Sequence, residues 1–370
     1  MLAPGRAPVL VAAGGTGGHL FPAEALAAAL MGRGIPVHLA TDERAARYGG
    51  AFSQQTIHVI ASATLRGRNP LAMAKTASAL GVGFIQAWWL LGRIRPQAVI
   101  GFGGYPTIPP VLAAAWRGIP SLIHDSNAVI GRANRLLAPR VTAIATTFPG
   151  VFRDAPKLSA KATLTGNPVR SAVVTAASIP YPATGELLRL LVFGGSQGAR
   201  ILADVVPAAI GRLNAELRGR LAIFHQAREE DLDRVRKAYA ALLVAAEVAP
   251  FFTDLPGRMA TSHLVVSRSG ASTVAELAAI GRPAILVPLP HALDQDQFAN
   301  AGVLEGAGGA IRLVQDAFTP DRLAAEIRGL AAAPERLAAM AAAARSLGRL
   351  DAADRLADLV LAVAANGANQ

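Results

Sequence analysis

The chain has 370 residues, enough for about two domains, and it contains no cysteine, so disulfides and thiolate metal sites are excluded. Its most apolar segment, residues 79–92, is too short to cross a bilayer, so we expect no transmembrane helix and a cytoplasmic location. The net charge of +11 lies in the first half, where residues 1–170 carry 17 Lys and Arg against 5 Asp and Glu, a surplus expected of a surface that faces phosphates, an anionic membrane or nucleic acid.

The first predicted element is a buried strand at residues 9–13, which leads into a glycine-rich loop at residues 14–18 and then into a helix. A tight glycine turn between a strand and a helix exposes backbone N–H groups at the positive end of the helix dipole, which suits phosphate. His19 follows this loop directly. It could act as a general base that takes a proton from an acceptor hydroxyl, or it could only hydrogen-bond the loop, and the residues alone leave both open.

A dinucleotide site is the obvious rival for this loop, because Asp42 ends the next predicted strand, where a ribose-binding acid would stand. However, the G-x-G-x-x-G fingerprint fails, since Leu20 occupies the place of the third glycine. No Gly-Lys-Ser/Thr follows the loop either, which argues against a Walker P-loop.

Residues 70–91 form a predicted helix with two apolar faces and basic flanks. One face carries Leu80, Phe84, Trp88 and Leu91, and the adjacent face carries Val82, Ile85 and Trp89. Aromatic apolar surface bordered by cations is typical of contact with anionic lipid. The predicted membrane contacts are Leu80, Phe84, Trp88, Trp89, Arg66, Arg68 and Lys75. The alternative is a core helix, which we expect for at least one of the two faces.

Further along, residues 101–106 (GFGGYP) form a second glycine loop after an apolar strand. The next predicted strand ends at His124, and Asn127 lies at the same rim. These side chains should meet the first loop, because parallel strands end at one edge of their sheet.

A pseudo-repeat organises the whole chain. Residues 8–30 and 189–210 both read as strand, glycine loop and helix, and Gly14 and Gly194 are their corresponding loop glycines. Proline and glycine punctuate residues 165–186 between the two halves. Together with the alternation of short apolar runs and Ala/Leu-rich helices, this predicts an α/β protein with two Rossmann-like, doubly wound domains and a cleft between them.

The second half adds a fourth glycine loop at residues 267–277 (SRSGASTVAEL). Glu276 in this stretch could complete a capping box with Thr273, or it could bind both hydroxyls of a ribose. The Asp294-Gln295-Asp296 stretch resembles a metal-binding D-x-D, but no further carboxylate or histidine cluster completes a site, so we expect polar contact with a sugar, shared with Gln297, and no metal. Four glycine loops in two domains indicate a substrate with phosphates on each side of a cleft.

The motifs of this chain resemble those of a known family. GGTGGHLFPA, LRGRNP, GFGGYPT, HDSNAVIGRANRLLA, TGNPVR, FGGSQGARIL, SRSGASTVAEL and DQDQFANA occur in the order found in the MurG family of peptidoglycan N-acetylglucosaminyltransferases. The resemblance implies a GT-B fold with an N-terminal acceptor domain at residues 1–168, a donor domain at residues 169–345, and a C-terminal helix at residues 346–370 that packs back on the first domain.

The implied activity is an inverting, metal-independent transfer of GlcNAc from UDP-GlcNAc to the C4 hydroxyl of the muramyl residue of lipid I, giving lipid II. The enzyme would be a peripheral protein on the cytoplasmic face of the bacterial inner membrane. No cofactor and no nucleic acid would be involved, and other cell-wall and division proteins are candidate partners. Another GT-B glycosyltransferase, a UDP-GlcNAc epimerase and a non-catalytic nucleotide-sugar-binding or scaffold protein remain as alternatives.

The resemblance also implies roles for individual residues. His19 would be the base, Glu276 would bind the ribose and the Phe252 backbone the uracil. The other implied donor-binding residues are Thr16, Gly17, Gly18, Asn127, Arg170, Ser196, Ala271, Ser272, Thr273, Val274, Ala275 and Gln297. The implied acceptor-pyrophosphate residues are Gly14, Gly15, Gly103, Gly104 and Tyr105.

Two departures from the family pattern stand out. The family usually has His-Glu-Gln-Asn where this chain has His124, Asp125, Ser126 and Asn127. The loop before Gln297 is one residue longer than in some relatives, which leaves the sugar contact open between Asp296 and Gln297.

Overall fold

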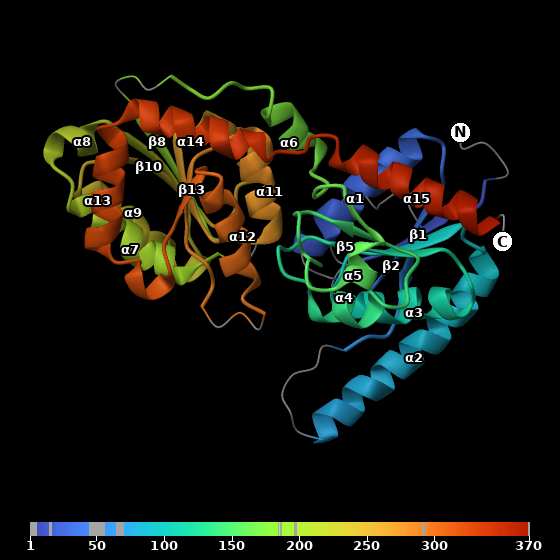
Figure 1. Cartoon of the computed structure of the whole chain (residues 1–370). Coiled ribbons are helices and arrows are strands. Elements are labelled where there is room, and N and C mark those ends of the chain that lie inside the picture. The colour runs from blue at the N-terminus through green and yellow to red at the C-terminus, as the bar shows by residue number, and fades with distance from the viewer. Residues whose placement is uncertain are drawn as a thin grey trace. The chain divides into compact units, whose positions relative to one another are not determined.

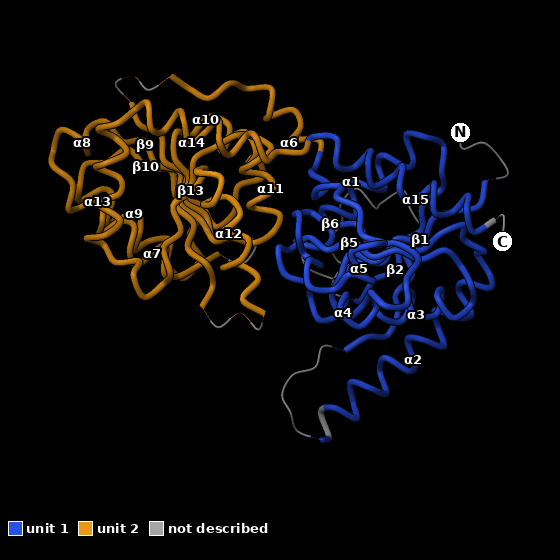
Figure 2. Tube along the Cα trace, in the orientation of Figure 1, with its two compact units in different colours: residues 1–170, 350–370 blue, residues 171–349 orange. Residues whose placement is uncertain are grey.

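The computed structural model describes residues 6–14, 17–43, 56–63, 70–183, 185, 187–195, 198–290, 292 and 294–368, with only the backbone described at 56, 71, 72 and 368. The chain divides into two compact units: unit 1 comprises residues 1–170 and 350–370, and unit 2 comprises residues 171–349 (Figure 2). Each unit is a parallel β-sheet covered by helices (Figure 1).

The strands described in unit 1 are β1 (Val9–Ala12), β2 (Val37–Thr41), β3 (Thr56–Val59), β4 (Ala98–Gly101), β5 (Ser121–Asp125), β6 (Ala143–Thr146) and β7 (Ala162–Leu164). Its helices are α1 (Gly17–Gly32), α2 (Pro70–Ile94), η3 (Tyr105–Thr107), α3 (Ile108–Trp116), α4 (Arg132–Leu137), α5 (Pro156–Ser159) and α15 (Ala352–Ala368).

The sheet of unit 1 has the order β3-β2-β1-β4-β5-β6-β7, and its strands pair in parallel. Successive residues of β1 point to opposite faces, and both faces are buried: Val9 and Val11 pack in a core with α1 and α15, and Leu10 packs in a core with α2, α3 and α4. The chain order reverses between β1 and β4. This reversal places the loops after these two strands at the position where open α/β sheets bind ligands.

The strands of unit 2 are β8 (Leu188–Phe193), β9 (Leu221–Gln226), β10 (Ala245–Ala249), β11 (Leu264–Ser267), β12 (Ala284–Leu286) and β13 (Ala310–Arg312). Its helices are α6 (Ser171–Ala176), α7 (Arg200–Gly211), α8 (Ala215–Gly219), η4 (Glu229–Asp231), α9 (Leu232–Ala241), α10 (Leu255–Thr261), α11 (Ala271–Ile280), α12 (Asp296–Gly306), η5 (Gln315–Ala317), α13 (Pro320–Ala331) and α14 (Pro334–Ser346).

The sheet of unit 2 has the order β10-β9-β8-β11-β12-β13, again with parallel pairing. Leu190 and Val192 of β8 pack in one core with α7, α9 and α13. The chain order reverses between β8 and β11, so the loops that follow these two strands take the ligand-binding position in this unit. Two doubly wound parallel sheets confirm the predicted α/β class.

None of the helices in the described parts of the chain is long and apolar enough to cross a membrane. The longest, α2, has its stripe of Leu80, Phe84 and Trp88 packed against the core of unit 1. The helix is therefore a core helix along that face, which is the alternative expected for one of its two faces. Trp89 lies on the other face, where it is 75% exposed.

Candidate functional site

The two glycine loops of unit 1 meet at His19. This residue lies in the first turn of α1, and its imidazole packs against the loop after β4: a Cβ built on Gly103 would lie 3.3 Å from Cε1 of the ring, and one on Gly104 would lie 3.5 Å from Cδ2. Both glycines have positive φ, 93° and 78°, a conformation that L side chains rarely adopt. The backbone conformation therefore favours glycine at both positions, and at Gly103 a Cβ would also press on the imidazole.

Asp125, at the end of β5, organises the loop that carries Asn127. Its buried carboxylate accepts hydrogen bonds from the backbone N–H of Asn127 (3.1 Å), the backbone N–H of Gly131 (3.0 Å) and the amide of Asn134 (3.0 Å). Asn134 also donates to the carbonyl oxygen of His124 (3.0 Å). Asp125, which stands where the family usually has glutamate, thus retains a carboxylate, and this carboxylate shapes the loop. Asn127 lies half-buried beside it.

His124 is fully buried and holds two strand ends together. Its Nε2 donates to the carbonyl oxygen of Gly166 in the loop after β7 (3.0 Å), and its ring lies against Phe102. Burial lowers the pKa of His124 to about 4, so the imidazole is neutral at physiological pH. This side chain therefore has a structural role at the rim of the sheet.

Arg170 lies in unit 1, beside the start of α1. Its guanidinium carbon is 4.2 Å from the ring centroid of Phe21. A Cβ built on Gly17 would lie 3.1 Å from Cε2 of the same ring. The structure thus brings Gly17, Phe21 and Arg170 together at the N-terminal turn of α1.

In unit 2 the glycine loop after β8 makes a tight turn. A Cβ on Gly194 would lie 2.2 Å from the backbone nitrogen of Ala199, so only glycine fits there. Gly195 and Gly198 both have positive φ, 84° and 65°. The loop therefore folds back on itself just before α7, as the sequence predicted for a glycine turn between a strand and a helix.

The capping-box interpretation of Glu276 is wrong. Helix α11 begins at Ala271, and Gly270 is its N-cap, so Thr273 and Glu276 lie inside the helix. Glu276 is 6% exposed and Val274 is a core residue, whereas Ala271, Ser272, Thr273 and Ala275 are half-buried. A helix that starts at this loop directs its free backbone N–H groups toward the carboxyl edge of the sheet.

Gln297 lies in the first turn of α12 and is tied to the loop after β11. The buried hydroxyl of Ser269 donates to the carbonyl oxygen of Gln297 (2.8 Å), and the amide of Asn300 donates to the carbonyl oxygen of Ser269 (3.3 Å). The side-chain oxygen of Gln297 accepts from the backbone N–H of Leu289 (3.0 Å). Asp296 instead accepts from the backbone N–H of Gln297 (2.8 Å), which occupies one of its carboxylate oxygens.

Some residues singled out from the sequence lie outside the described residues. These are Gly15, Thr16, Arg66, Arg68 and Ser196. Of the others, Gly14 is buried, Tyr105 packs on the core of unit 1, Gly18 is exposed and Lys75 is exposed. Within the described parts of the chain, no three His, Asp or Glu side chains gather closely enough to hold a metal ion.

Sequence reasoning missed several residues that position the site. Ser269 and Asn134 act through buried hydrogen bonds, and Gln226 at the end of β9 contacts two neighbouring loops. Isolated amides and hydroxyls carry no recognisable spacing. Only the position of Gln226, as the last residue of a strand, would have marked it as a rim residue.

Comparisons with known proteins agree with this architecture. Residues 9–146 match the glycosyltransferase family 28 N-terminal domain, and residues 189–356 match the glycosyltransferase family 28 C-terminal domain. Among solved structures, a MurG of Acinetobacter baumannii has a TM-score of 0.78 at 29% identity and covers 96% of this chain and 99% of that chain. A UDP-GlcNAc 2-epimerase from Neisseria meningitidis, at 14% identity and a TM-score of 0.68, shares the fold.

Curated relatives found by sequence have higher sequence identity to this chain than the solved structures named above. A UDP-N-acetylglucosamine–N-acetylmuramyl-(pentapeptide) pyrophosphoryl-undecaprenol N-acetylglucosamine transferase of Rhodopseudomonas palustris is 63% identical over 358 residues, 96% of this chain and 98% of its own length. The transferase of the same name from Nitrobacter winogradskyi is 60% identical over 362 residues, 97% of this chain and 98% of its own length.

The two doubly wound sheets with glycine loops at their carboxyl edges, together with these matches, define a glycosyltransferase of the GT-B fold. Within that class the chain belongs to the MurG family, the UDP-N-acetylglucosamine–N-acetylmuramyl-(pentapeptide) pyrophosphoryl-undecaprenol N-acetylglucosamine transferases. It is accordingly a hexosyltransferase.

Proposed function

We propose that the protein transfers GlcNAc from UDP-GlcNAc to the C4 hydroxyl of the muramyl residue of lipid I, producing lipid II and UDP. The observation that carries this proposal is the 63% identity over 96% of the chain to a transferase of that name. The reaction needs one binding site for a nucleotide diphosphate and another for a lipid pyrophosphate. The loops at the carboxyl edges of the two sheets supply backbone N–H groups for both.

The donor binds to unit 2. Glu276, which is buried on α11 and does not cap the helix, accepts hydrogen bonds from the ribose hydroxyls. The backbone of Phe252 pairs with the uracil, and the N–H groups at the start of α11 face the diphosphate. Gln297 contacts the sugar through the nitrogen of its amide, because the amide oxygen accepts from the backbone N–H of Leu289. Ser196 adds a contact to the diphosphate.

The acceptor binds to unit 1, where His19 acts as the general base. The loops that contain Gly14, Gly103 and Gly104 bind the pyrophosphate of lipid I through backbone N–H groups. His19 takes the proton of the C4 hydroxyl as its oxygen attacks the anomeric carbon of GlcNAc. The bond from that carbon to the UDP oxygen breaks in the same displacement, UDP leaves with the electron pair, and the anomeric configuration inverts.

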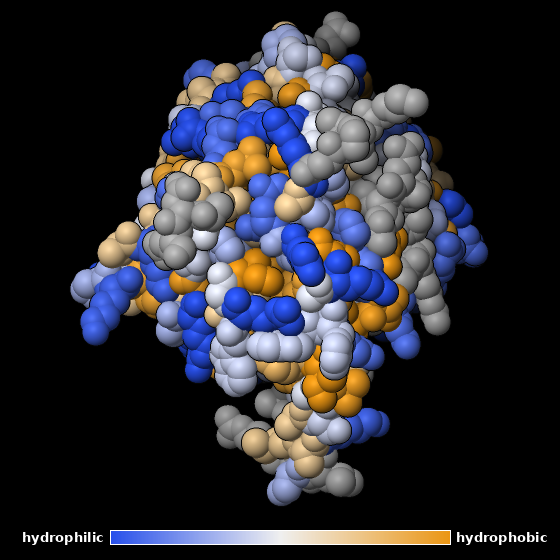
Figure 3. Space-filling view, turned by 90° about the vertical axis from the view of Figure 1, so that its right-hand side faces the viewer, coloured by the Kyte–Doolittle hydropathy of each residue, from blue (hydrophilic) through white to orange (hydrophobic). Residues whose placement is uncertain are grey.

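The protein binds the membrane surface through the outer face of α2. Val82 (48% exposed), Ile85 (58%) and Trp89 (75%) lie on this face, and Trp116 of α3 (66%) lies close by, with its side chain against Phe84. Figure 3 shows apolar side chains among hydrophilic ones on the helix that extends at the bottom of the view. Exposed Lys75 and Arg93 supply cations that attract anionic lipid.

The test is a transfer assay with the purified chain, UDP-GlcNAc, a short-chain lipid I analogue and EDTA. UDP and a β-linked disaccharide product should form together, and His19→Ala should abolish most of the turnover while UDP still binds. Folded protein that binds UDP-GlcNAc but forms no disaccharide would contradict the proposal. Conversion of the donor without any lipid acceptor would instead indicate an epimerase.

A further inference from the structure

The loop of residues 250–254, between β10 and α10, has a buried ring at its centre. Phe252 is only 5% exposed as a whole residue, whereas its neighbour Phe251 is 59% exposed. In the proposed function the backbone of Phe252 recognises uracil. Recognition by backbone groups depends on where the chain is held, because those groups are the same in every residue. The side chains that hold this loop therefore decide how well it distinguishes one base from another.

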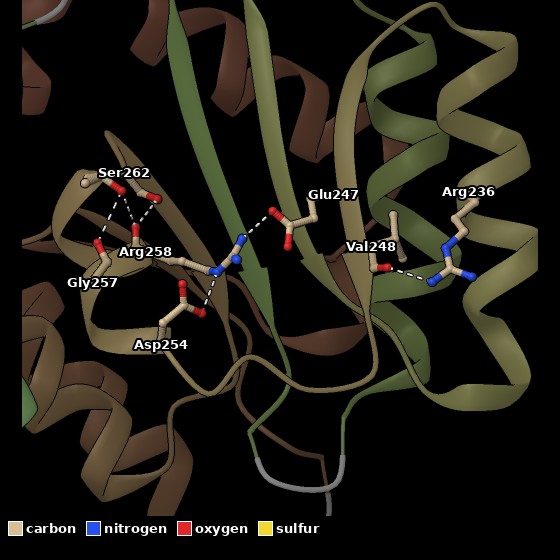
Figure 4. A network of polar contacts seen from close by, with 8 residues as sticks. Arg236, Glu247, Val248, Asp254, Gly257, Arg258 and Ser262 are labelled. Carbon is tan, nitrogen blue, oxygen red and sulfur yellow. Dashed lines mark hydrogen bonds and ion pairs between the residues drawn. The ribbon is translucent and has the colours of Figure 1, made fainter.

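Arg258 holds the centre and the end of the loop from the first turn of α10. Its guanidinium carbon lies 4.3 Å from the ring centroid of Phe252 and 4.6 Å from that of Phe224 in β9. Its Nε donates to Asp254 (2.8 Å) and its Nη1 to Glu247 of β10 (2.6 Å), as Figure 4 shows. Stacking on aromatic rings and a two-sided ion pair together define the orientation of a planar guanidinium.

The ion pair of Arg258 with Asp254 favours the charged form of both side chains. The hydrogen bond from Arg258 lowers the pKa of the Asp254 carboxyl, and the hydrogen bond to Glu247 raises the pKa of Arg258. The side chain of Arg258 is only 18% exposed, although its two acidic partners are more than half exposed. The guanidinium is therefore enclosed by the rings and the loop, so its contacts are less screened by solvent than those of an ordinary surface pair.

Gln226 holds the beginning of the same loop. It is the last residue of β9, the strand between β8 and β10, so its side chain can contact the loops that follow both neighbours. Its carboxamide oxygen accepts from the N–H of Gly194 (3.2 Å), and its nitrogen donates to the carbonyl oxygens of Gly195 (3.1 Å) and Pro250 (3.2 Å). One buried carboxamide thus joins the glycine loop after β8 to the start of the 250–254 loop.

We propose that Gln226 and Arg258 are positioning residues for the nucleotide, which hold the 250–254 loop at its two ends so that the Phe252 backbone selects uracil. This inference rests on the proposed function. Arg258 affects recognition of the base alone, because its side chain contacts only the 250–254 loop and the strands β9 and β10 among the contacts described. Gln226 affects the binding of both the base and the diphosphate, because it also hydrogen-bonds Gly194 and Gly195 of the glycine loop after β8.

The experiment compares UDP with CDP as ligands of the full chain by isothermal titration calorimetry. Arg258→Met should raise the Kd of UDP about tenfold and that of CDP less than about twofold, so that discrimination between the two bases narrows. Gln226→Glu, whose second oxygen would face the carbonyl oxygens of Gly195 and Pro250, should raise both Kd values about tenfold. The KM for UDP-GlcNAc should follow the Kd of UDP, while kcat and the KM for lipid I stay within about twofold.

The matched control is Arg236→Met. Arg236 donates to the carbonyl oxygen of Val248 in the same strand as Glu247 (2.9 Å), but from α9, as Figure 4 shows, and it should leave both Kd values unchanged. Arg258→Lys keeps a cation for Asp254 and Glu247 but removes the planar guanidinium from the rings of Phe252 and Phe224. This variant should lose part of the discrimination between UDP and CDP. This second variant serves if Arg258→Met fails to fold.

The outcomes separate the two proposals. Equal discrimination between UDP and CDP in wild type and in a folded Arg258 variant would overturn the positioning role. Wild-type protein that does not bind UDP at all would instead contradict the proposed function.

Discussion

The imidazole of His19 lies against the backbone of Gly103, so closely that a Cβ on the glycine would be 3.3 Å from the ring. Gly103→Ala should therefore push the His19 ring away slightly and lower kcat by about tenfold, because catalysis is sensitive to small misplacements of a reacting group. The KM for UDP-GlcNAc should change little. Steady-state kinetics with saturating lipid I analogue measures both.

The matched control for this variant is Gly118→Ala. Gly118 also has a positive φ, 71°, and lies in the same unit, but a Cβ there would meet nothing within 4 Å. Both substitutions carry the backbone strain, of about 1–2 kcal/mol, and only the one at Gly103 touches His19. Equal loss of kcat in the two variants would refute the role of the contact.

Glu276 should bind the ribose, since it is buried and does not cap α11. Glu276→Gln should raise the KM for UDP-GlcNAc about 10- to 100-fold, as expected when a charged acceptor of hydrogen bonds is lost. It should also narrow the difference in Kd between UDP and 2′-deoxy-UDP, measured by calorimetry. Glu326→Gln on α13, whose carboxylate pairs with Arg322, serves as control and should change neither. A Glu276 variant that still discriminates against the deoxy ligand would exclude the ribose contact.

Trp89 and Trp88 are adjacent in sequence but differ in burial. Trp89 is 75% exposed, whereas Trp88 packs on the core of unit 1 with the guanidinium carbon of Arg117 4.7 Å from its ring centroid. Trp89→Ser should weaken binding to anionic vesicles and leave Tm unchanged, and Trp88→Ser should lower Tm. Vesicle sedimentation and thermal unfolding separate these effects. Vesicle binding that survives Trp89→Ser would place the membrane contact elsewhere.

The free energy of unfolding should decrease as the pH is lowered below about 6.5, because the buried histidines remain neutral in the folded protein. Burial lowers the pKa of His124 to about 4 and that of His225 to about 3, from an ordinary value of 6.5. Between about pH 6.5 and 4 the unfolded chain binds more protons, so the free energy of unfolding decreases as pH falls, by about 3 kcal/mol for the fully buried His124.

The variant His124→Asn tests this dependence. The substitution should lower the free energy of unfolding by about 1 kcal/mol at pH 7.5, because the hydrogen bond to Gly166 is lost. On acidification, the variant should lose less further stability than the wild type does. Urea unfolding at pH 7.5 and pH 4.5 gives the difference. Parallel pH profiles for the variant and the wild type would show that His124 does not contribute.

Arg282 is a buried guanidinium surrounded by carbonyl groups. It is 1% exposed and donates to the carbonyl oxygens of Ile179, Pro180, Ala260, Ile280 and Gly281. Arg282→Met should lower the free energy of unfolding by about 3 kcal/mol or more, because several buried acceptors lose their donor. The exposed Arg328 on α13 provides the control, since Arg328→Met should cost less than about 0.5 kcal/mol in the same urea titration.

The local features of the site were predictable because each depends on a few consecutive residues. Gly14 and Gly194 follow apolar strands and precede helices, and this short-range pattern predicted both glycine turns and the α/β class. Glu276 shows the limit of such reasoning. Its spacing from Thr273 matched a capping box, but the helix starts earlier, at Ala271, and the box does not form.

By itself, then, the sequence determined two doubly wound sheets, their glycine loops and the family, since periodicity and motif order are properties of the linear chain. Only the tertiary structure decided which of Trp88 and Trp89 faces solvent, because both faces of α2 are apolar and the packing of α2 on α3 selects one. It also decided that Gln226 joins two loops. Crossover connections bring β8, β9 and β10 together, and the contacts of Gln226 depend on that strand order.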